Sequence, residues 1–238
     1  MSRFDVSVSA RKVGFFLLCP VLVLAALTVP MELAEQAFRP VSWTVADLFR
    51  RFTLNSEGAI PAWFSTMLLL CAGSLLVFCG LFYRTKGDRW WKHWTALGAL
   101  FGLLSLDEAI GLHETLMAPM SKLVEAEGIF HFAWVIPGAI VVGVLGLAWL
   151  PFLWHLNKTT RNRFIVAACL FVGGALGMEM VGGLVIEQFG EYSIAYMLTT
   201  TVEETCEMLG MVVFISSIVA HLTNELGEIR LTFAAPKT

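Results

Sequence analysis

Residues 95–117 read TALGALFGLLSLDEAIGLHETLM. The first half of this stretch is mostly apolar, whereas the second half carries four ionisable side chains: Asp107, Glu108, His113 and Glu114. A helix needs about 20 apolar residues to cross a hydrocarbon core of roughly 30 Å, and this stretch is long enough. It therefore predicts a helix that crosses a membrane and carries a polar site within it.

The whole chain has the composition of a membrane protein. It has 238 residues, of which 57% are hydrophobic and only 15% are charged, whereas soluble proteins average about 25% charged residues. We predict a single all-α domain over residues 1–238, an integral membrane bundle of six transmembrane helices. The expected spans cover about residues 13–31, 59–83, 94–117, 132–155, 164–187 and 194–221.

The lysine and arginine residues predict the orientation of these spans. Cytoplasmic loops are enriched in both residues, and twelve of the sixteen fall on the side that holds the two termini. The larger set is Arg3, Arg11, Lys12, Arg84, Lys86, Arg89, Lys92, Lys158, Arg161, Arg163, Arg230 and Lys237, and the smaller set is Arg39, Arg50, Arg51 and Lys122. We expect a multi-pass protein of the plasma (bacterial inner) membrane with both termini cytoplasmic.

The longest outer connection contains an amphipathic segment, residues 41–52. Val41, Val45 and Leu48 fall on one helical face, whereas Asp47 lies off it. This pattern is typical of an interfacial helix on the outer membrane surface. An ordinary ordered loop is the alternative.

Further acids interrupt the fifth and sixth expected spans. Glu179 lies in the fifth span, and Glu203, Glu204 and Glu207 lie in the sixth. At 1.5 Å per helical residue, most of these acids and the Asp107–Glu108 pair lie about 12–15 Å below the outer helix ends. Glu207 lies deeper, at about 20 Å, and Glu114 shallower, at about 5 Å. We therefore expect the third, fifth and sixth spans to be neighbours around one shared site.

Helical periodicity supports this grouping. Asp107, Glu108 and Glu114 occupy one arc of roughly 120°, whereas His113 points about 100° away and is a marginal ligand. Glycines in the fifth span permit close helix contact near Glu179.

A shared acidic site needs positive charge, because carboxylates cannot all ionise in a medium of low dielectric constant. The spans offer no lysine or arginine near these acids. Carboxylate oxygens suit hard divalent cations such as Mg²⁺, Ca²⁺ and Mn²⁺. We predict a site for one or two divalent metal ions of unknown identity, with these ligands: Asp107, Glu108, His113, Glu114, Glu179, Glu203, Glu204 and Glu207.

Several alternatives remain open at this point. One alternative is a proton- or cation-coupled membrane transporter, in which protons take the place of the metal. Another is a purely structural role, in which the acids are protonated and hydrogen-bonded to Ser105, Thr199, Thr200 or the backbone. A membrane metalloenzyme with a lipid or quinone substrate is a further reading, as is a subunit or assembly factor that binds partner membrane subunits. The sequence has no basic stripe of the kind that binds nucleic acid.

Two motifs resemble those of uncharacterised bacterial multipass membrane proteins. They are LDEAIGLHE, residues 106–114, and EETCEMLG, residues 203–210. In that group an LDE-x4-HE span is followed by a late EE-x2-EMLG span. The resemblance implies a bacterial integral membrane protein of about six spans and supplies no function.

Overall fold

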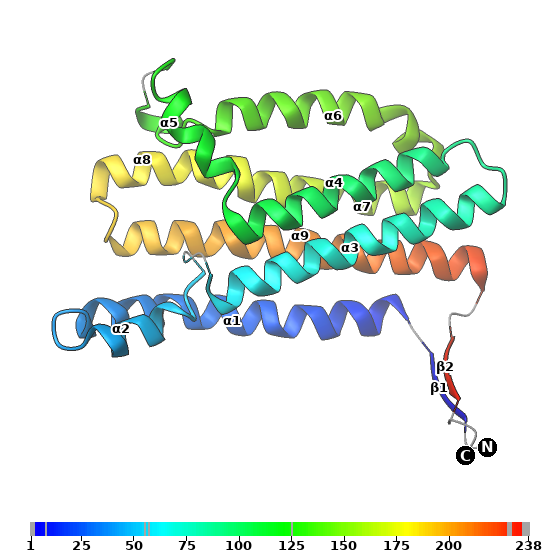
Figure 1. Ribbon diagram of the computed structural model, residues 1–238, viewed down its shortest axis with the longest axis horizontal. Helices are drawn as coiled ribbons and strands as arrows, with labels where there is room; N and C mark the ends of the chain where they lie inside the picture. The colour runs from blue at the N-terminus through cyan, green and yellow to red at the C-terminus, as the bar shows by residue number, and fades with distance from the viewer. Residues whose placement is uncertain are drawn as a thin grey trace.

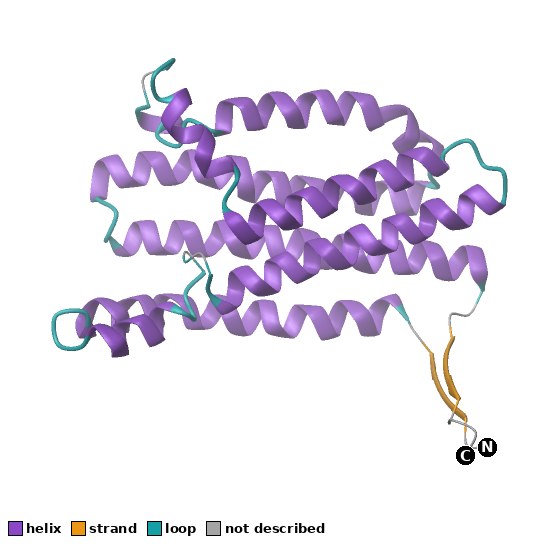
Figure 2. Cartoon of the chain, viewed as in Figure 1, coloured by secondary structure: helices purple, strands orange, loops and turns teal. Residues whose placement is uncertain are grey.

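The computed structural model of the protein describes residues 3–7, 9–54, 56, 58–124, 126–227 and 230–234. The elements are β1 (Arg3–Ser7), α1 (Ala10–Phe38), α2 (Trp43–Arg50), α3 (Ile60–Thr85), α4 (Trp91–Ile110), η1 (His113–Leu116), α5 (Met117–Met120), η2 (Gly128–Phe130), α6 (Val135–His155), α7 (Lys158–Val172), η3 (Gly173–Met178), α8 (Glu179–Phe189), α9 (Ile194–Leu226) and β2 (Arg230–Ala234). Long helices dominate the chain, as Figure 2 shows, which confirms the prediction of an all-helical protein.

The number of spans depends on one broken helix. Among the described residues, five helices are long and apolar enough to cross a membrane, and a sixth span results if α4 and the segment His113–Met120 count as one. These two pieces meet at an angle of 77°. The span expected over residues 94–117 is therefore helical up to Ile110, where α4 ends, and bends sharply after it.

Helix α9 is the centre of the bundle. It packs against α1, α3, α7, η3 and α8, while α4 packs mainly along α3. Figure 1 shows these long helices lying roughly side by side, with α6 on the outside of the bundle. The expected arrangement of spans is thus met in part: η3 and α8 contact α9 directly, and α4 reaches α9 through the stacked rings of Phe101 and Phe214, whose centroids are 4.9 Å apart.

An aromatic core fills one end of the bundle. Trp94 and Phe152 are almost completely buried, with ring centroids 5.0 Å apart. The hydroxyl of Tyr83 lies 2.7 Å from Nε2 of the buried His221, and the His221 ring stacks on Trp94 at 5.2 Å.

Two smaller features flank the bundle. The amphipathic segment is helical over α2, which packs along α1. Trp43 and Leu48 of this helix, and Val41 just before it, are exposed. The position of α2 on a membrane surface stays a prediction. The strands β1 and β2 pair antiparallel, with Arg3 opposite Ala234. The side chains of Arg3 and Arg230, which the orientation prediction used, are not described, and Lys237 lies outside the described residues.

Candidate cation site

The site begins at the break after α4. Gly111 adopts a left-handed conformation with φ 59° and ψ 43°, which a residue with a Cβ adopts only at a cost. Its amide still bonds to the carbonyl oxygen of Asp107 at 2.7 Å, which closes the last turn of the helix. The chain then turns sharply into η1, so the residues after Gly111 leave the line of α4.

This turn brings His113 back to Asp107. The backbone amide of His113 donates to Asp107 Oδ1 at 2.7 Å, and His113 Nδ1 lies 2.9 Å from Asp107 Oδ2. The imidazole also packs on Trp134, with ring centroids 4.6 Å apart. The expectation that His113 points away from the acids is therefore wrong, because the straight helical wheel stops at the break.

Helix breaking also shapes the second wall of the site. The segment η3 is π-helical and runs directly into α8, which begins at Glu179. A Cβ on Gly174 would lie 2.8 Å from both the carbonyl oxygen of Glu203 and Cγ of Glu207. The lack of a side chain at this position therefore lets η3 approach α9 closely beside two of the predicted acids.

Glu179 connects three elements. Its Oε1 accepts a hydrogen bond of 3.2 Å from Trp134 Nε1, which lies just before α6. Its carboxyl group lines the same cavity as that of Glu203 on α9.

Three hydroxyl groups of the spans or segments that carry the acids donate their protons to backbone carbonyl oxygens. Thr199 donates to the carbonyl oxygen of Ala195 at 2.9 Å, and Thr200 donates to backbone carbonyls one turn before it. Ser105 donates to the Thr66 carbonyl on α3 at 3.0 Å. Each hydroxyl has one proton to donate, so these three groups do not act as donors to the carboxylates.

All the predicted site residues line one cavity of about 430 Å³. The predicted set is Asp107, Glu108, His113, Glu114, Glu179, Glu203, Glu204 and Glu207. The lining residues range along the chain from Leu54 and Ser56, in the connection before α3, to Glu207 on α9. Within the described part of the chain, no lysine or arginine contributes to its lining.

Arg39, at the C-terminal end of α1, forms an ion pair with Glu35 and does not line the cavity. Arg39 Nη2 lies 2.5 Å from Glu35 Oε1. Hydrogen bonds to Glu35 and then to Tyr192 raise the pKa of the Arg39 guanidinium above its usual value. This cation is therefore paired at the end of the bundle and is absent from the cavity wall described above.

The acids surround the cavity and do not converge on a point. Among the described residues, no group of three or more His, Cys, Asp or Glu side chains has the geometry to hold a metal ion directly. The metal site stays a prediction, and its ligands would have to bind through water or move.

Sequence reasoning missed the part that Trp134 plays in this cavity. Trp134 contributes to the cavity wall and supplies a hydrogen-bond donor to Glu179. Trp134 lies in the expected fourth span, which carries no acid. The only available signal was its position near the outer end of that span, which is too common to identify a site.

Comparison with curated proteins and with solved structures finds no match. One protein family, described as a domain of unknown function (DUF8692), matches residues 15–222. The matched range includes every residue that lines the cavity. The chain, a helical bundle with the character of a membrane protein, therefore belongs to the DUF8692 family.

Proposed function

We propose that this protein is a multi-pass membrane protein whose acidic cavity binds one or two divalent metal ions. The observation that carries the proposal is the composition of the cavity wall: seven carboxyl groups and one imidazole, with no lysine or arginine among the described lining residues. Burying several like charges is costly unless a cation or protons compensate them. A divalent ion supplies the most positive charge in the least volume.

The chemistry of the donors supports a hard cation. Carboxylate oxygens and water are the ligands that Mg²⁺, Ca²⁺ and Mn²⁺ prefer. Asp107 holds His113 through Nδ1, and a carboxylate in this position typically orients a histidine so that Nε2 can bind a metal. The wide spacing of the acids favours an ion that keeps part of its hydration shell.

Binding is favoured over passage through the protein. Below Glu207, the side chain of Phe214 packs on Phe101 and on Phe164, with ring centroids 4.9 Å and 4.7 Å away. These rings belong to a tightly packed apolar core, which offers no ligands to an ion leaving the cavity. We propose that the cavity lies in the outer half of the membrane, towards the side opposite the two termini.

Metal analysis of the protein purified in a neutral detergent tests the proposal. We expect at least one divalent ion per chain, or stoichiometric binding when Mn²⁺ is titrated and its free signal is followed by electron paramagnetic resonance. The double substitution Glu203→Gln and Glu204→Gln should weaken Mn²⁺ binding by at least about tenfold. The matched control is Glu225→Gln, since Glu225 is an exposed acid of the same helix at its other end.

Two results would contradict the metal proposal. One is a folded protein that binds no divalent ion on titration. The other is an equal loss of Mn²⁺ affinity in the Glu225→Gln control, which would show that the effect comes from overall charge.

A proton-coupled role is the second candidate, and the gathering of acids in one cavity favours it. Carboxyl groups that line the same cavity can form a site that takes up and releases protons in coupled steps. In reconstituted vesicles, this role predicts cation flux that depends on a pH gradient and is lost on substitution of Glu203 and Glu204 by glutamine. Firm metal binding without flux would favour the static site.

A further inference from the structure

Helix α6 is fixed to the bundle at its two ends and stands away from it between them. At one end Phe152 is fully buried and Trp149 Nε1 donates to the carbonyl oxygen of His93 at 3.4 Å. At the other end Val135 is buried, next to Trp134 and its bond to Glu179. Over residues 139–148 every side chain except Leu145 is exposed. An apolar helix that is exposed on all faces is covered by something other than this bundle.

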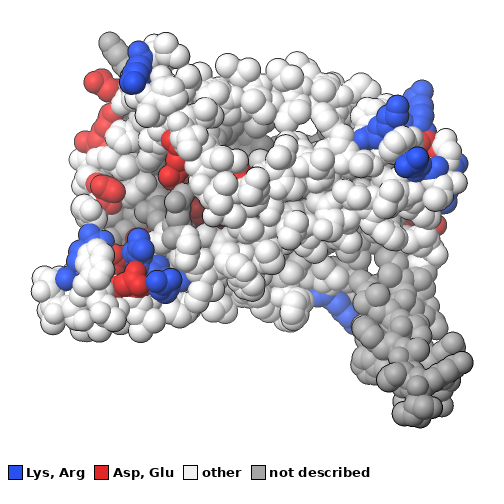
Figure 3. Space-filling model, in the orientation of Figure 1, with Lys and Arg blue, Asp and Glu red and all other residues white. Residues whose placement is uncertain are grey.

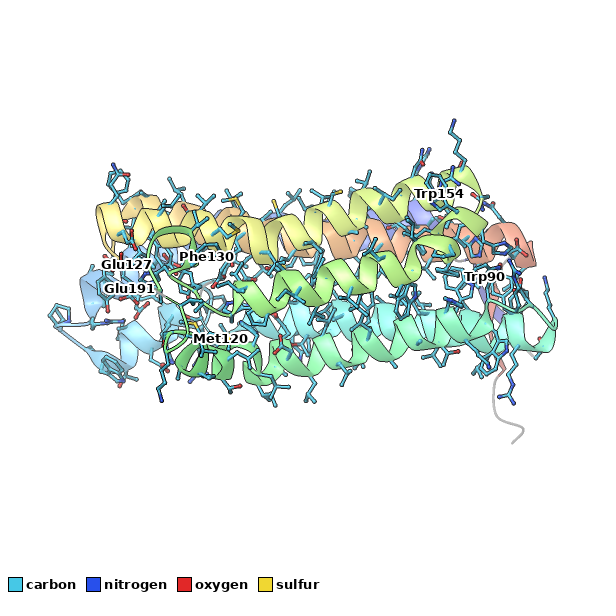
Figure 4. All side chains as sticks on the ribbon, turned by 90° about the horizontal axis from the view of Figure 1, so that it is seen from above. Trp90, Met120, Glu127, Phe130, Trp154 and Glu191 are labelled. Carbon is cyan, nitrogen blue, oxygen red and sulfur yellow. The ribbon has the colours of Figure 1, made fainter. Side chains whose placement is uncertain are left out.

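Helix α6 also forms the roof of the acidic cavity. In the view of Figure 4, from above, α6 runs lengthwise over the space between α4 on one side and α7 with α8 on the other. Pro137, Gly138, Val141 and Val142 contribute to the cavity wall, and Val141 is at the same time 54% exposed. Figure 3 shows the surface hollowed below α6, with acidic side chains visible on the same face. The cavity is therefore open sideways, in the plane where a bilayer would lie.

The size and lining of the cavity indicate the class of molecule that fits. Its volume of about 430 Å³ falls in the range of roughly 300–1,000 Å³ that is typical of pockets for small organic ligands. The wall near α4 and α9 is acidic, whereas the wall near α6 and η3 is apolar, with Val141, Val142 and Leu176. One polar wall and one apolar wall that opens to the bilayer suit an amphiphile that enters from the membrane.

We propose that the cavity binds a membrane amphiphile with a phosphate head group, and that a divalent metal ion joins the phosphate to the carboxylates. The inference rests on the proposed metal site and names the ligand that shares it. Mg²⁺ is usually held by one or two carboxylates together with the phosphate of a substrate, and less often by a complete set of protein ligands. The acyl chain would lie in the opening below α6, against Val141 and Val142.

The charges make this binding conditional on the metal. Without the metal, the acidic wall repels the phosphate group. Without the amphiphile, the metal ion lacks the phosphate ligand, and other lipid fills the apolar opening. Metal and amphiphile should therefore strengthen each other's binding by the same factor, because coupling between two ligands is reciprocal.

The test uses the full chain in a neutral maltoside detergent, with Mn²⁺ as the metal and dodecyl phosphate as the amphiphile. We expect dodecyl phosphate to tighten Mn²⁺ binding by about tenfold, within the usual range of coupling between ligands. Inorganic phosphate at the same concentration should have little effect, because it lacks the chain. Dodecylamine, which has the same chain and a cationic head, should not tighten Mn²⁺ binding.

Two substitutions in α6 separate the chain site from the metal site. Val141→Trp fills the opening and should abolish the effect of dodecyl phosphate while Mn²⁺ still binds. Val144→Trp is the matched control, since Val144 is an exposed valine of the same helix that does not line the cavity. If Val141→Trp does not fold, Val142→Trp takes its place, because Val142 also lines the cavity.

Each other result overturns the inference in a recognisable way. Equal tightening by inorganic phosphate would show that the phosphate comes from water, and unchanged Mn²⁺ binding with dodecyl phosphate would remove the amphiphile while leaving the metal site intact. Displacement of Mn²⁺ by dodecylamine would assign the cavity to an organic cation. If Mn²⁺ does not bind under any condition, the proposed function itself fails and this inference fails with it.

Discussion

The contact at Gly174 allows a sharp test of how the acidic cavity is assembled. A Cβ at this position would lie 2.8 Å from the carbonyl oxygen of Glu203, whereas ordinary contacts begin at 3.4 Å. For Gly174→Ala, η3 and α9 must therefore separate locally by about 0.6 Å, which a close-packed interface resists. Overpacking of this kind typically costs about 1–3 kcal/mol of folding free energy. The same shift should weaken Mn²⁺ binding by about tenfold, because it moves Glu203 and Glu207 relative to the opposite wall.

The neighbouring glycine is the matched control. A Cβ on Gly173 would meet nothing within 4 Å, and alanine is more favourable than glycine inside a helix by about 0.5–1 kcal/mol. Gly173→Ala should therefore leave the protein as stable as before or slightly more stable, with unchanged Mn²⁺ affinity. Denaturation in detergent, followed by tryptophan fluorescence, and Mn²⁺ titration measure both quantities. Equal stability and equal metal affinity of the two variants would refute the claim that close approach at Gly174 positions the acids.

Three further predictions follow from the described contacts. Gly111→Ala should destabilise the protein by about 1–2 kcal/mol, because alanine must adopt a left-handed conformation just after α4. Gly102→Ala, within α4, should not destabilise it, because a Cβ there meets nothing within 4 Å. Denaturation of both variants measures the difference. Tyr83→Phe removes the hydroxyl 2.7 Å from His221 Nε2 and should cost about 1–3 kcal/mol by leaving a buried nitrogen without its partner; full stability of this variant would show that water replaces the hydroxyl. Mn²⁺ affinity should rise as the pH rises, because carboxyl groups lose their protons to bind metal, and a flat profile would contradict binding by protonatable acids.

Much of the architecture could be predicted because it depends on composition and length. Apolar runs of about 20 residues identify helices that can cross a bilayer without knowledge of their partners. The grouping of the acids was also predictable, since depth along a helix follows from residue spacing alone. Asp107, Glu179 and Glu203 indeed line one cavity, although their role as metal ligands stays a prediction.

The parts that could not be predicted are those where the helices are irregular. The wheel that placed His113 away from the acids assumes a straight helix up to residue 117, and Gly111 ends that helix. Glycine is common within membrane helices, so the sequence alone does not say which glycine adopts a positive φ. The π-helical turn of η3 has the same character, because its glycines alone do not distinguish a π-helical turn from a regular helix.

These irregular segments lie at the cavity itself. A regular helix bonds its backbone polar groups within itself, so a bundle of straight helices offers none of these groups to a cavity between them. The break at Gly111 lets His113 fold back onto Asp107, and η3 leads into α8 at Glu179, which lines the same cavity as Glu203. Breaks in membrane helices persist where the freed backbone groups face protein or a water-filled space, and such a space is where an ion can bind. The two departures from regular structure and the acidic cavity are therefore best understood as one feature, and a variant that straightens either helix should lose metal binding together with the cavity.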